Sequence, residues 1–196
     1  MTRNFDAVLW DVGNVFVRWD PRAAVELDGA AWEQFAPVFA TLNHAADSGA
    51  ERADQLAQLR AAGSPWEAAY AQYVARMRHA LLGPVAGTAD LVPQLRAAGV
   101  TQVVLSNWPR GEFHLAHQVA PVLAQMDGIV TSGEEGVAKP DPRLFRIALA
   151  RYNLVPERTL FVDDMPANVA AAQELGLHTH QFSGAAALAA ALGLAH

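Results

Sequence analysis

The stretch Phe5-Asp6-Ala7-Val8-Leu9-Trp10-Asp11-Val12-Gly13 decides how the rest of the chain folds. Its apolar residues follow one another without alternating with polar ones, which is typical of a strand buried on both faces of a parallel sheet. Asp11 comes directly after this strand, predicted over Phe5–Trp10. Because open parallel sheets bind ligands where their strands end, the stretch predicts a central strand and a functional carboxylate just beyond it.

Further strands and helices alternate along the chain. Helices are expected before Gly99, after the N-cap Asp141, over Pro166–Leu175 and over the alanine-rich end at Gly184–Leu194. This alternation predicts an α/β fold, a doubly wound parallel sheet with helices on both faces. Runs rich in β-branched or aromatic residues predict the remaining strands over Val100–Leu105, Gly128–Thr131, Thr159–Val162 and, more weakly, His178–Phe182.

The segment 20–84 differs from the rest because it shows helical patterns and no convincing strand. Helices are expected over 30–42 and 50–62, and Ser64-Pro65-Trp66-Glu67 fits a capping box for a third. We interpret 20–84 as a helical cap inserted into a core formed by 1–19 and 85–196. An apolar stripe follows the capping box at helical spacing and is interpreted as core packing rather than a ligand site: Trp66, Tyr70, Tyr73, Val74, Met77 and Leu81.

Composition narrows the possible partners. The 196 residues carry a formal net charge of −6, so there is no overall basic field to hold a nucleic acid. No cysteine is present, which excludes disulfides and thiolate zinc sites. The charged residues within 1–11 do not fit a signal peptide, and no apolar run is long enough to cross a bilayer. We therefore expect a cytoplasmic protein without a membrane or nucleic-acid partner.

Polar residues gather at the predicted carboxyl ends of the strands. Asp11 follows the first strand, Ser106-Asn107 the second and Asp163-Asp164 the fourth, while Lys139 precedes the helix that Asp141 caps. Each alone fits a helix cap or a solvated surface residue. Together they would place three carboxylates, a hydroxyl, an amide and an ammonium at one rim, and the repulsion between adjacent aspartates favours a bound cation. Such a rim suits Mg²⁺ and a phosphate group.

Four short motifs carry a resemblance to a known family. Leu9–Val15, Leu105–Asn107, Lys139–Pro140 and Phe161–Asp164 resemble, in order and spacing, the signature motifs of the haloacid dehalogenase-like hydrolases. The likeness covers nearly the whole chain, and the segment 20–84 resembles that family's first-position cap. Residues 11–20 are most similar to small bacterial phosphatases that act on sugar phosphates.

The resemblance implies a hydrolase that forms an aspartyl-phosphate on Asp11 and releases phosphate from a small phosphorylated metabolite. It implies Mg²⁺ held by Asp11, the backbone carbonyl of Gly13 and Asp164, with Asp163 on a water bound to the ion. Ser106, Lys139 and the backbone amides near Asn107 would hold the phosphoryl oxygens.

One position departs from the family pattern. The phosphatases carry a second aspartate, the general acid, two residues after the nucleophile, where this chain has Gly13. General acid catalysis contributes about 10²–10⁴-fold, so a substitute or an acidic leaving group is expected. Possible substitutes for the missing general acid are Asp20, His44, His114 and His117.

The residues that follow Ser106-Asn107 are open to two interpretations. Trp108-Pro109-Arg110 fits a contact with the leaving group and a structural loop equally.

Two alternatives stay open at this level. A metal-independent 2-haloacid dehalogenase of the same family would also lack the second aspartate, although Asp163-Asp164 argues against it. A phosphate-binding regulatory protein with poor turnover would fit Gly13 as well. Nothing in the sequence indicates an oligomeric state.

Overall fold

The computed structural model describes residues 5–194, so the ends of the predicted core segments, 1–4 and 195–196, lie outside the described residues. A parallel sheet of five strands, in the order β5-β4-β1-β6-β7, forms the centre of the molecule. All five predicted strands are confirmed to within two residues. They are β1 (Ala7–Trp10), β4 (Thr101–Ser106), β5 (Gly128–Thr131), β6 (Thr159–Asp163) and β7 (His178–Gln181).

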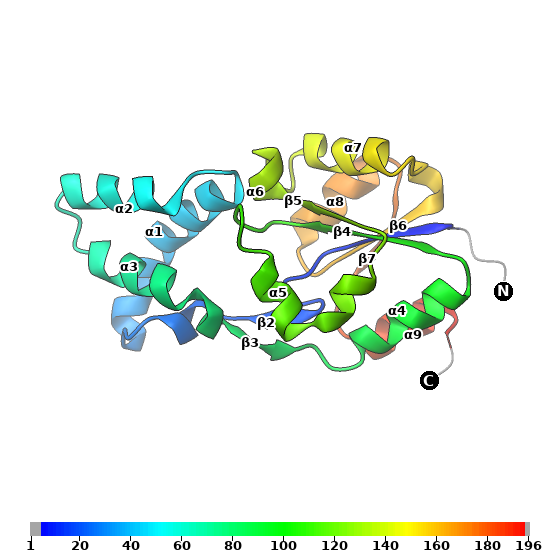
Figure 1. The fold of residues 1–196 in the computed structure, drawn as a ribbon, viewed down its shortest axis with the longest axis horizontal. Coiled ribbons are helices and arrows are strands. Elements are labelled where there is room, and N and C mark those ends of the chain that lie inside the picture. The colour runs from blue at the N-terminus through cyan, green and yellow to red at the C-terminus, as the bar shows by residue number, and fades with distance from the viewer. Residues whose placement is uncertain (1–4, 195–196) are drawn as a thin grey trace.

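Helices cover both faces of this sheet, as Figure 1 shows. Side chains of β1 point alternately to the two layers: Val8 and Trp10 join one apolar cluster, and Leu9 joins the other. The doubly wound α/β prediction is therefore confirmed. The first layer holds α4 (Thr88–Ala97), α5 (His114–Val119) and α9 (Ala185–Leu192), and the second holds α7 (Pro142–Arg151) and α8 (Pro166–Glu174), with the short α6 (Ser132–Glu135) beside β5.

The helices of residues 20–84 lie together at the left of Figure 1, apart from the five-stranded sheet, and we call this segment the helical insert. The prediction of no strand here was wrong at its end, because Leu81, assigned to the helical stripe, begins a strand. This strand pairs antiparallel with a strand just before the insert, so the two form a ribbon between the lobes. The elements are β2 (Val17–Trp19), α1 (Gly29–Asp47), α2 (Arg52–Ala61), α3 (Glu67–Arg76) and β3 (Leu81–Pro84).

The predicted capping box does not form. The helix α3 begins at Glu67 after Trp66, and the Ser64 hydroxyl accepts from the backbone N–H of Trp66 (3.3 Å). The Glu67 carboxylate pairs instead with Arg60 of α2 (2.8 Å). The sequence pattern was misleading because the helix starts at the glutamate, whereas a capping box needs that residue in the third helical position.

The aromatic stripe of α3 packs into the interior of the insert, as predicted. Tyr70 and Tyr73 are buried, and the Tyr73 ring lies edge-on to Phe39 of α1 (centroids 4.6 Å apart). Core packing is therefore part of its role.

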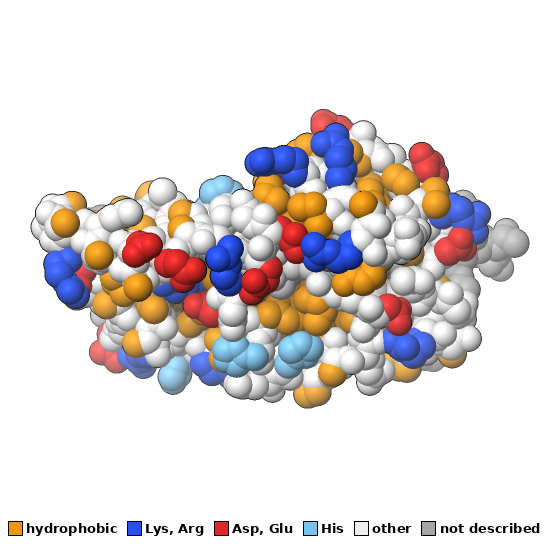
Figure 2. All heavy atoms as spheres, turned by 45° about the horizontal axis from the view of Figure 1, so that its top comes forward, with side chains coloured by type: hydrophobic (Ala, Val, Ile, Leu, Met, Phe, Trp, Pro, Cys, Tyr) orange, Lys and Arg blue, Asp and Glu red, His pale blue; other side chains and the backbone are white. Residues whose placement is uncertain are grey.

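Ion pairs join the insert to the sheet lobe. Arg52, buried at the start of α2, pairs with Glu112 of the sheet lobe (3.1 Å). More exposed pairs link Arg110 to Glu51 and Glu134, each at 3.9 Å. Acidic and basic side chains lie interspersed along this junction on the face that Figure 2 shows. Within residues 5–194, no helix is both long and apolar enough to cross a membrane.

Candidate active site at the carboxyl ends of the strands

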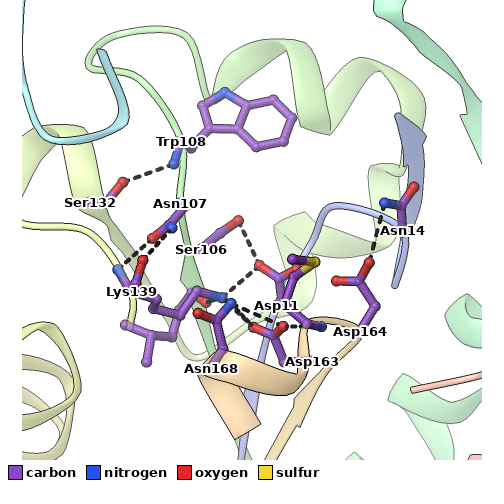
Figure 3. A network of polar contacts seen from close by, with 12 residues as sticks. Asp11, Asn14, Ser106, Asn107, Trp108, Ser132, Lys139, Asp163, Asp164 and Asn168 are labelled. Atoms are coloured by element: carbon purple, nitrogen blue, oxygen red, sulfur yellow. Dashed lines mark hydrogen bonds and ion pairs between the residues drawn. The ribbon is translucent and has the colours of Figure 1, made fainter. Parts of the chain in front are cut away.

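Asp11 lies at the centre of a polar network at the carboxyl end of β1 (Figure 3). Its Oδ1 accepts hydrogen bonds from the Ser106 hydroxyl (3.0 Å) and from the Lys139 ammonium (2.8 Å). Both side-chain donors address Oδ1, which leaves Oδ2 without a side-chain donor among residues 5–194. Asp11 is only 7% exposed, so two side-chain donors hold its Oδ1 in a buried position.

Lys139 is buried and joins three strand ends. Its ammonium donates to Asp11 after β1, to the backbone carbonyl of Leu105 in β4 (2.8 Å) and to Asp163 in β6 (2.7 Å). The Asn107 side chain fixes the backbone of Lys139, accepting from its N–H (2.8 Å) and donating to its carbonyl (2.9 Å). Asn107 therefore positions the lysine with its amide side chain.

Asp163 is completely buried and already fully bonded. Its Oδ2 accepts from Lys139 and from the Asn168 amide (3.0 Å), and its Oδ1 accepts from Asn168 (3.1 Å) and from the Met165 N–H (2.8 Å). A carboxylate offers about four acceptor positions, so these bonds use all of them. Asp163 therefore has a structural role, because it binds Lys139 and the first turn of α8.

Asp164 differs from its neighbour because it is half-buried and nearly free. Among the described side chains, its only hydrogen-bond donor is the Asn14 amide, at 3.3 Å. Ligand atoms of Asp11, Asp163 and Asp164 lie within 4.8 Å of one another. Three carboxylates therefore face the single ammonium of Lys139, a surplus of negative charge that a divalent cation would balance.

The pKa values follow from burial and charge. Burial raises the pKa of Asp11 to about 6, against the opposing charge of Lys139 and with a contribution from Asp163. Burial, followed by the charge of Asp163, also raises the pKa of Asp164. Burial acts to lower the pKa of Lys139, but the charges of Asp11 and Asp163 outweigh it and raise that pKa. The lysine therefore stays a cation, while Asp11 and Asp164 favour an additional positive charge nearby.

A pocket lies over this network, with about 720 Å³ of empty space when the adjoining open solvent is included. Its floor carries the polar residues of the strand ends, and its wall is largely apolar. Trp108 and Pro109 line it, whereas Arg110 is held by Glu51 and Glu134 at the junction. The apolar wall includes Trp19, Tyr73, Met77, Leu81, Trp108, Pro109 and Met165.

Two features of this wall were missed from the sequence. Tyr73, Met77 and Leu81 were interpreted as core alone, yet they also line the pocket. Asn43 and Asp47 of α1 line it as well, and no local pattern singled them out because only the packing of the insert brings them to the site. Their spacing of four residues on one helix face was the single available signal.

The suggested substitutes for the missing acid lie elsewhere. None of Asp20, His44, His114 and His117 is among the residues that line the pocket. Asp20 caps a short helical turn and holds Arg22 (3.0 Å). Gly13 does line the pocket, and a Cβ built on it would meet only Asp11 Oδ2, at 3.9 Å. A Cβ at position 13 therefore has room.

Comparison with known proteins places this geometry in a family. The sequence model of the haloacid dehalogenase-like hydrolases matches residues 5–176. The chain is 27% identical over 191 residues to the sesquiterpene phosphatase astK of Aspergillus oryzae, covering 90% of this chain and 89% of that protein. It is 40% identical over 91 residues to mouse acyl-CoA dehydrogenase family member 10, which is 45% of this chain but only 8% of that protein.

Solved structures share the fold. The HAD family enzyme BT-2542 of Bacteroides thetaiotaomicron, crystallised with magnesium and inorganic phosphate, superposes with a TM-score of 0.74 at 22% identity. The match covers 92% of this chain and 95% of that one. At this identity the likeness concerns the fold alone.

The buried position of Lys139 leads to a test of stability. Lys139→Met leaves two carboxylates buried without their cation, so we expect the free energy of unfolding to fall by about 3–5 kcal/mol in metal-free buffer. Urea denaturation measures it. Arg143→Met is the matched control, because it removes an exposed pair with Asp141 (2.8 Å) and should change little. Equal effects of the two substitutions would contradict the structural role of Lys139.

Proposed function

The chain belongs to the haloacid dehalogenase-like hydrolases, and on that premise we propose that it is a magnesium-dependent phosphatase of small phosphate monoesters. The observation that carries the proposal is the state of Asp11, a buried carboxylate in the pocket whose Oδ1 accepts from two side-chain donors, whereas its Oδ2 accepts from none among the described residues. An aspartate held in this way is a competent nucleophile toward phosphorus.

Asp11, Asp164 and the backbone carbonyl of Gly13 would hold the metal. This set fits Mg²⁺, because carboxylate and carbonyl oxygens are the ligands that the ion prefers. Asp164 has free acceptor positions, whereas Asp163 has none, which supports Asp164 as the direct ligand. When bound, the ion would offset the repulsion between a carboxylate and a phosphate dianion.

The residues of the chain then divide the work. Asp11 attacks phosphorus with Oδ2, because Oδ1 is held by Ser106 and Lys139. The positive charge of Lys139 and the hydroxyl of Ser106, both in contact with Asp11, would stabilise the charge that accumulates on the phosphoryl oxygens during transfer. Water then attacks the phosphoryl group on Asp11 and releases inorganic phosphate.

The leaving group would point toward the apolar wall. Tyr73, Met77 and Leu81 of the insert face this side, so a substrate with an apolar portion gains affinity by burying it there. The Aspergillus relative is named as a sesquiterpene phosphatase, and sesquiterpenes are largely apolar. Both observations favour a phosphate ester with an apolar leaving group over the sugar phosphates that residues 11–20 suggested.

A dehalogenase is the second candidate, and the acidic residues distinguish the two. A metal-free halide displacement needs no free carboxylate beside its nucleophile, yet Asp164 lies there with its acceptors open. Gly13 is the observation that keeps a phosphate-binding regulatory protein as an alternative. Turnover and its dependence on metal decide among the three.

The nucleophile can be tested first. Asp11→Asn keeps the shape of the side chain but removes most of its nucleophilicity, so hydrolysis of 4-nitrophenyl phosphate should fall by several orders of magnitude. Mass spectrometry of acid-quenched enzyme should find the phosphoryl group on Asp11 in the unmodified protein. Asp20→Asn, outside the pocket, should keep full activity. A phosphoryl group on another residue would disprove the mechanism.

The metal can be tested without turnover. Mg²⁺ at about 100 times its Kd should add about 2.7 kcal/mol to the free energy of unfolding, read as a rise in Tm. Asp164→Asn should abolish this rise. Chelation should stop hydrolysis of 4-nitrophenyl phosphate, and Mg²⁺ should restore it. Full activity in excess chelator, together with chloride release from 2-chloropropionate, would favour the dehalogenase.

The apolar wall predicts a preference for substrates with an apolar leaving group, and substitution of one exposed residue of the wall can test it. Met165 lines the pocket yet is 53% exposed, so Met165→Ser should be tolerated by the fold. We expect kcat/KM for 4-nitrobenzyl phosphate to fall about 4-fold. This is the effect of losing the burial of one methylene group of the substrate, which is worth ~0.8 kcal/mol. Glucose 6-phosphate should be a poor substrate and insensitive to the change. Val155→Ser, 52% exposed and outside the pocket, is the control. An equal loss for both substrates would contradict an apolar contact.

A further inference from the structure

A polar pair interrupts the apolar wall that the insert contributes to the pocket. Asn43 and Asp47 lie one turn apart on α1, and the Asn43 amide donates to Asp47 Oδ2 (2.9 Å). Both line the pocket that holds Asp11. Asp47 is the only acidic side chain that the described part of the insert contributes to this pocket.

Packing alone does not explain a carboxyl group at this position. Asp47 is 9% exposed, and burying a carboxylate without a cation is costly. It is also the last residue of α1, where the helix dipole disfavours negative charge. The nearby cation, Arg52, is bonded to Glu112 and to the Tyr70 hydroxyl (3.1 Å). Burial and the helix dipole oppose ionisation of Asp47, and the charge of Arg52 offsets them only in part.

The pKa of Asp47 reflects its burial and the charges around it. Burial raises the pKa of Asp47 to about 7; the charge of Arg52 opposes the rise, the charges of Glu112 and Asp11 add to it, and Lys139 opposes it more weakly. The group can therefore both carry and release a proton near neutral pH.

We propose that Asp47 donates the proton to the leaving oxygen and thereby replaces the aspartate that this chain lacks at position 13. The assignment rests on the proposed function. It follows from the position of the carboxyl group, on the wall that the leaving group would face and in the same pocket as Asp11. It also follows from the contacts of Asp47, because within residues 5–194 its only hydrogen-bonded side chain is the neutral Asn43.

The step balances as follows. Asp11 Oδ2 forms a bond to phosphorus as the bond from phosphorus to the leaving oxygen breaks, and that electron pair stays on the leaving oxygen. The proton of Asp47 moves to this oxygen, which gives a neutral alcohol, an aspartyl-phosphate and an Asp47 carboxylate. In the second half-reaction, a water molecule attacks the aspartyl-phosphate. The Asp47 carboxylate takes a proton from this water as the water oxygen bonds to phosphorus. The bond from phosphorus to Asp11 then breaks, and both carboxyl groups return to their starting states.

Two substrates of nearly equal shape separate proton donation from binding. The leaving group of 4-nitrophenyl phosphate is the anion of an acidic phenol, which can leave without a proton. The leaving group of 4-nitrobenzyl phosphate is the anion of an alcohol, which needs a proton as it leaves. Alcohol or phenol release is measured in a single turnover with enzyme and Mg²⁺ in excess, so that only the first half-reaction is observed. Folding of each variant is checked by circular dichroism and Tm.

Asp47→Asn should slow release of 4-nitrobenzyl alcohol by about 10²-fold or more, while release of 4-nitrophenol stays within about 10-fold. Phosphoenzyme should then accumulate on Asp11 with 4-nitrophenyl phosphate, because water lacks its base. His44→Gln, an exposed change on the same helix, is the matched control and should alter neither rate. Adding Gly13→Asp to Asp47→Asn should restore release of the alcohol, since a Cβ at position 13 meets no close neighbour and a carboxyl group there would lie beside Asp11.

An equal loss for the two substrates, or no loss for either, would overturn the assignment and leave Asp47 as a structural or binding residue. Turnover of 4-nitrophenyl phosphate that survives Asp11→Asn would instead remove the proposed function itself. The two failures are therefore distinguishable.

Discussion

The buried ammonium of Lys139 is the interaction on which the rest of the site depends. It binds the end of β4 through a backbone carbonyl and the ends of β1 and β6 through the carboxylates Asp11 and Asp163. These three strands are neighbours in the sheet, so this strand order brings the partners of the lysine together. A buried ion pair stabilises a fold only when its remaining acceptors are satisfied. Asn168 and the Met165 N–H satisfy them at Asp163, and Ser106 helps to do so at Asp11.

The charge of this network also limits what the pocket can bind. One ammonium faces three carboxylates, so without a cation the floor repels anions. Under the proposed function, a phosphate ester would approach once a divalent ion has offset that charge, and the open acceptors of Asp164 would provide the position of the ion. In the proposed function, binding of the metal therefore favours binding of the substrate. Lys139 is held by three contacts on one side of the site, and Asp164 has open acceptors on the other.

Much of this arrangement could be predicted because it depends on local sequence. Strands buried on both faces leave continuous apolar runs, and the rule that ligands bind at strand ends selected Asp11, Ser106, Asp163 and Asp164. The rest depends on contacts between distant segments. Nothing in the sequence indicated that Asn168 fills the acceptors of Asp163 or that β2 and β3 pair across the insert. The four-residue spacing of Asn43 and Asp47 placed them on one helix face but did not indicate that this face reaches the pocket. The stripe of α3 was understood only in part because one face of a helix can pack into a core and line a cavity at once.

The absence of a side chain at Gly13 changes where the proton has to come from. In the pattern that the family resemblance implies, nucleophile and acid belong to one loop, so their separation is set by two residues of backbone. Here, among the described residues that line the pocket, the one carboxyl group assigned neither to the nucleophile nor to the metal lies across the junction, on α1 of the insert. The distance between the two groups then depends on how the insert packs against the sheet lobe. The contact is specific, because buried Arg52 pairs with Glu112, and because a Cβ at Gly49, two residues after Asp47, would lie 3.2 Å from the Gly133 carbonyl. Close packing of this kind holds side chains in one arrangement. If Asp47 is the donor, the junction is part of the catalytic apparatus, and the insert completes the site as well as covering it.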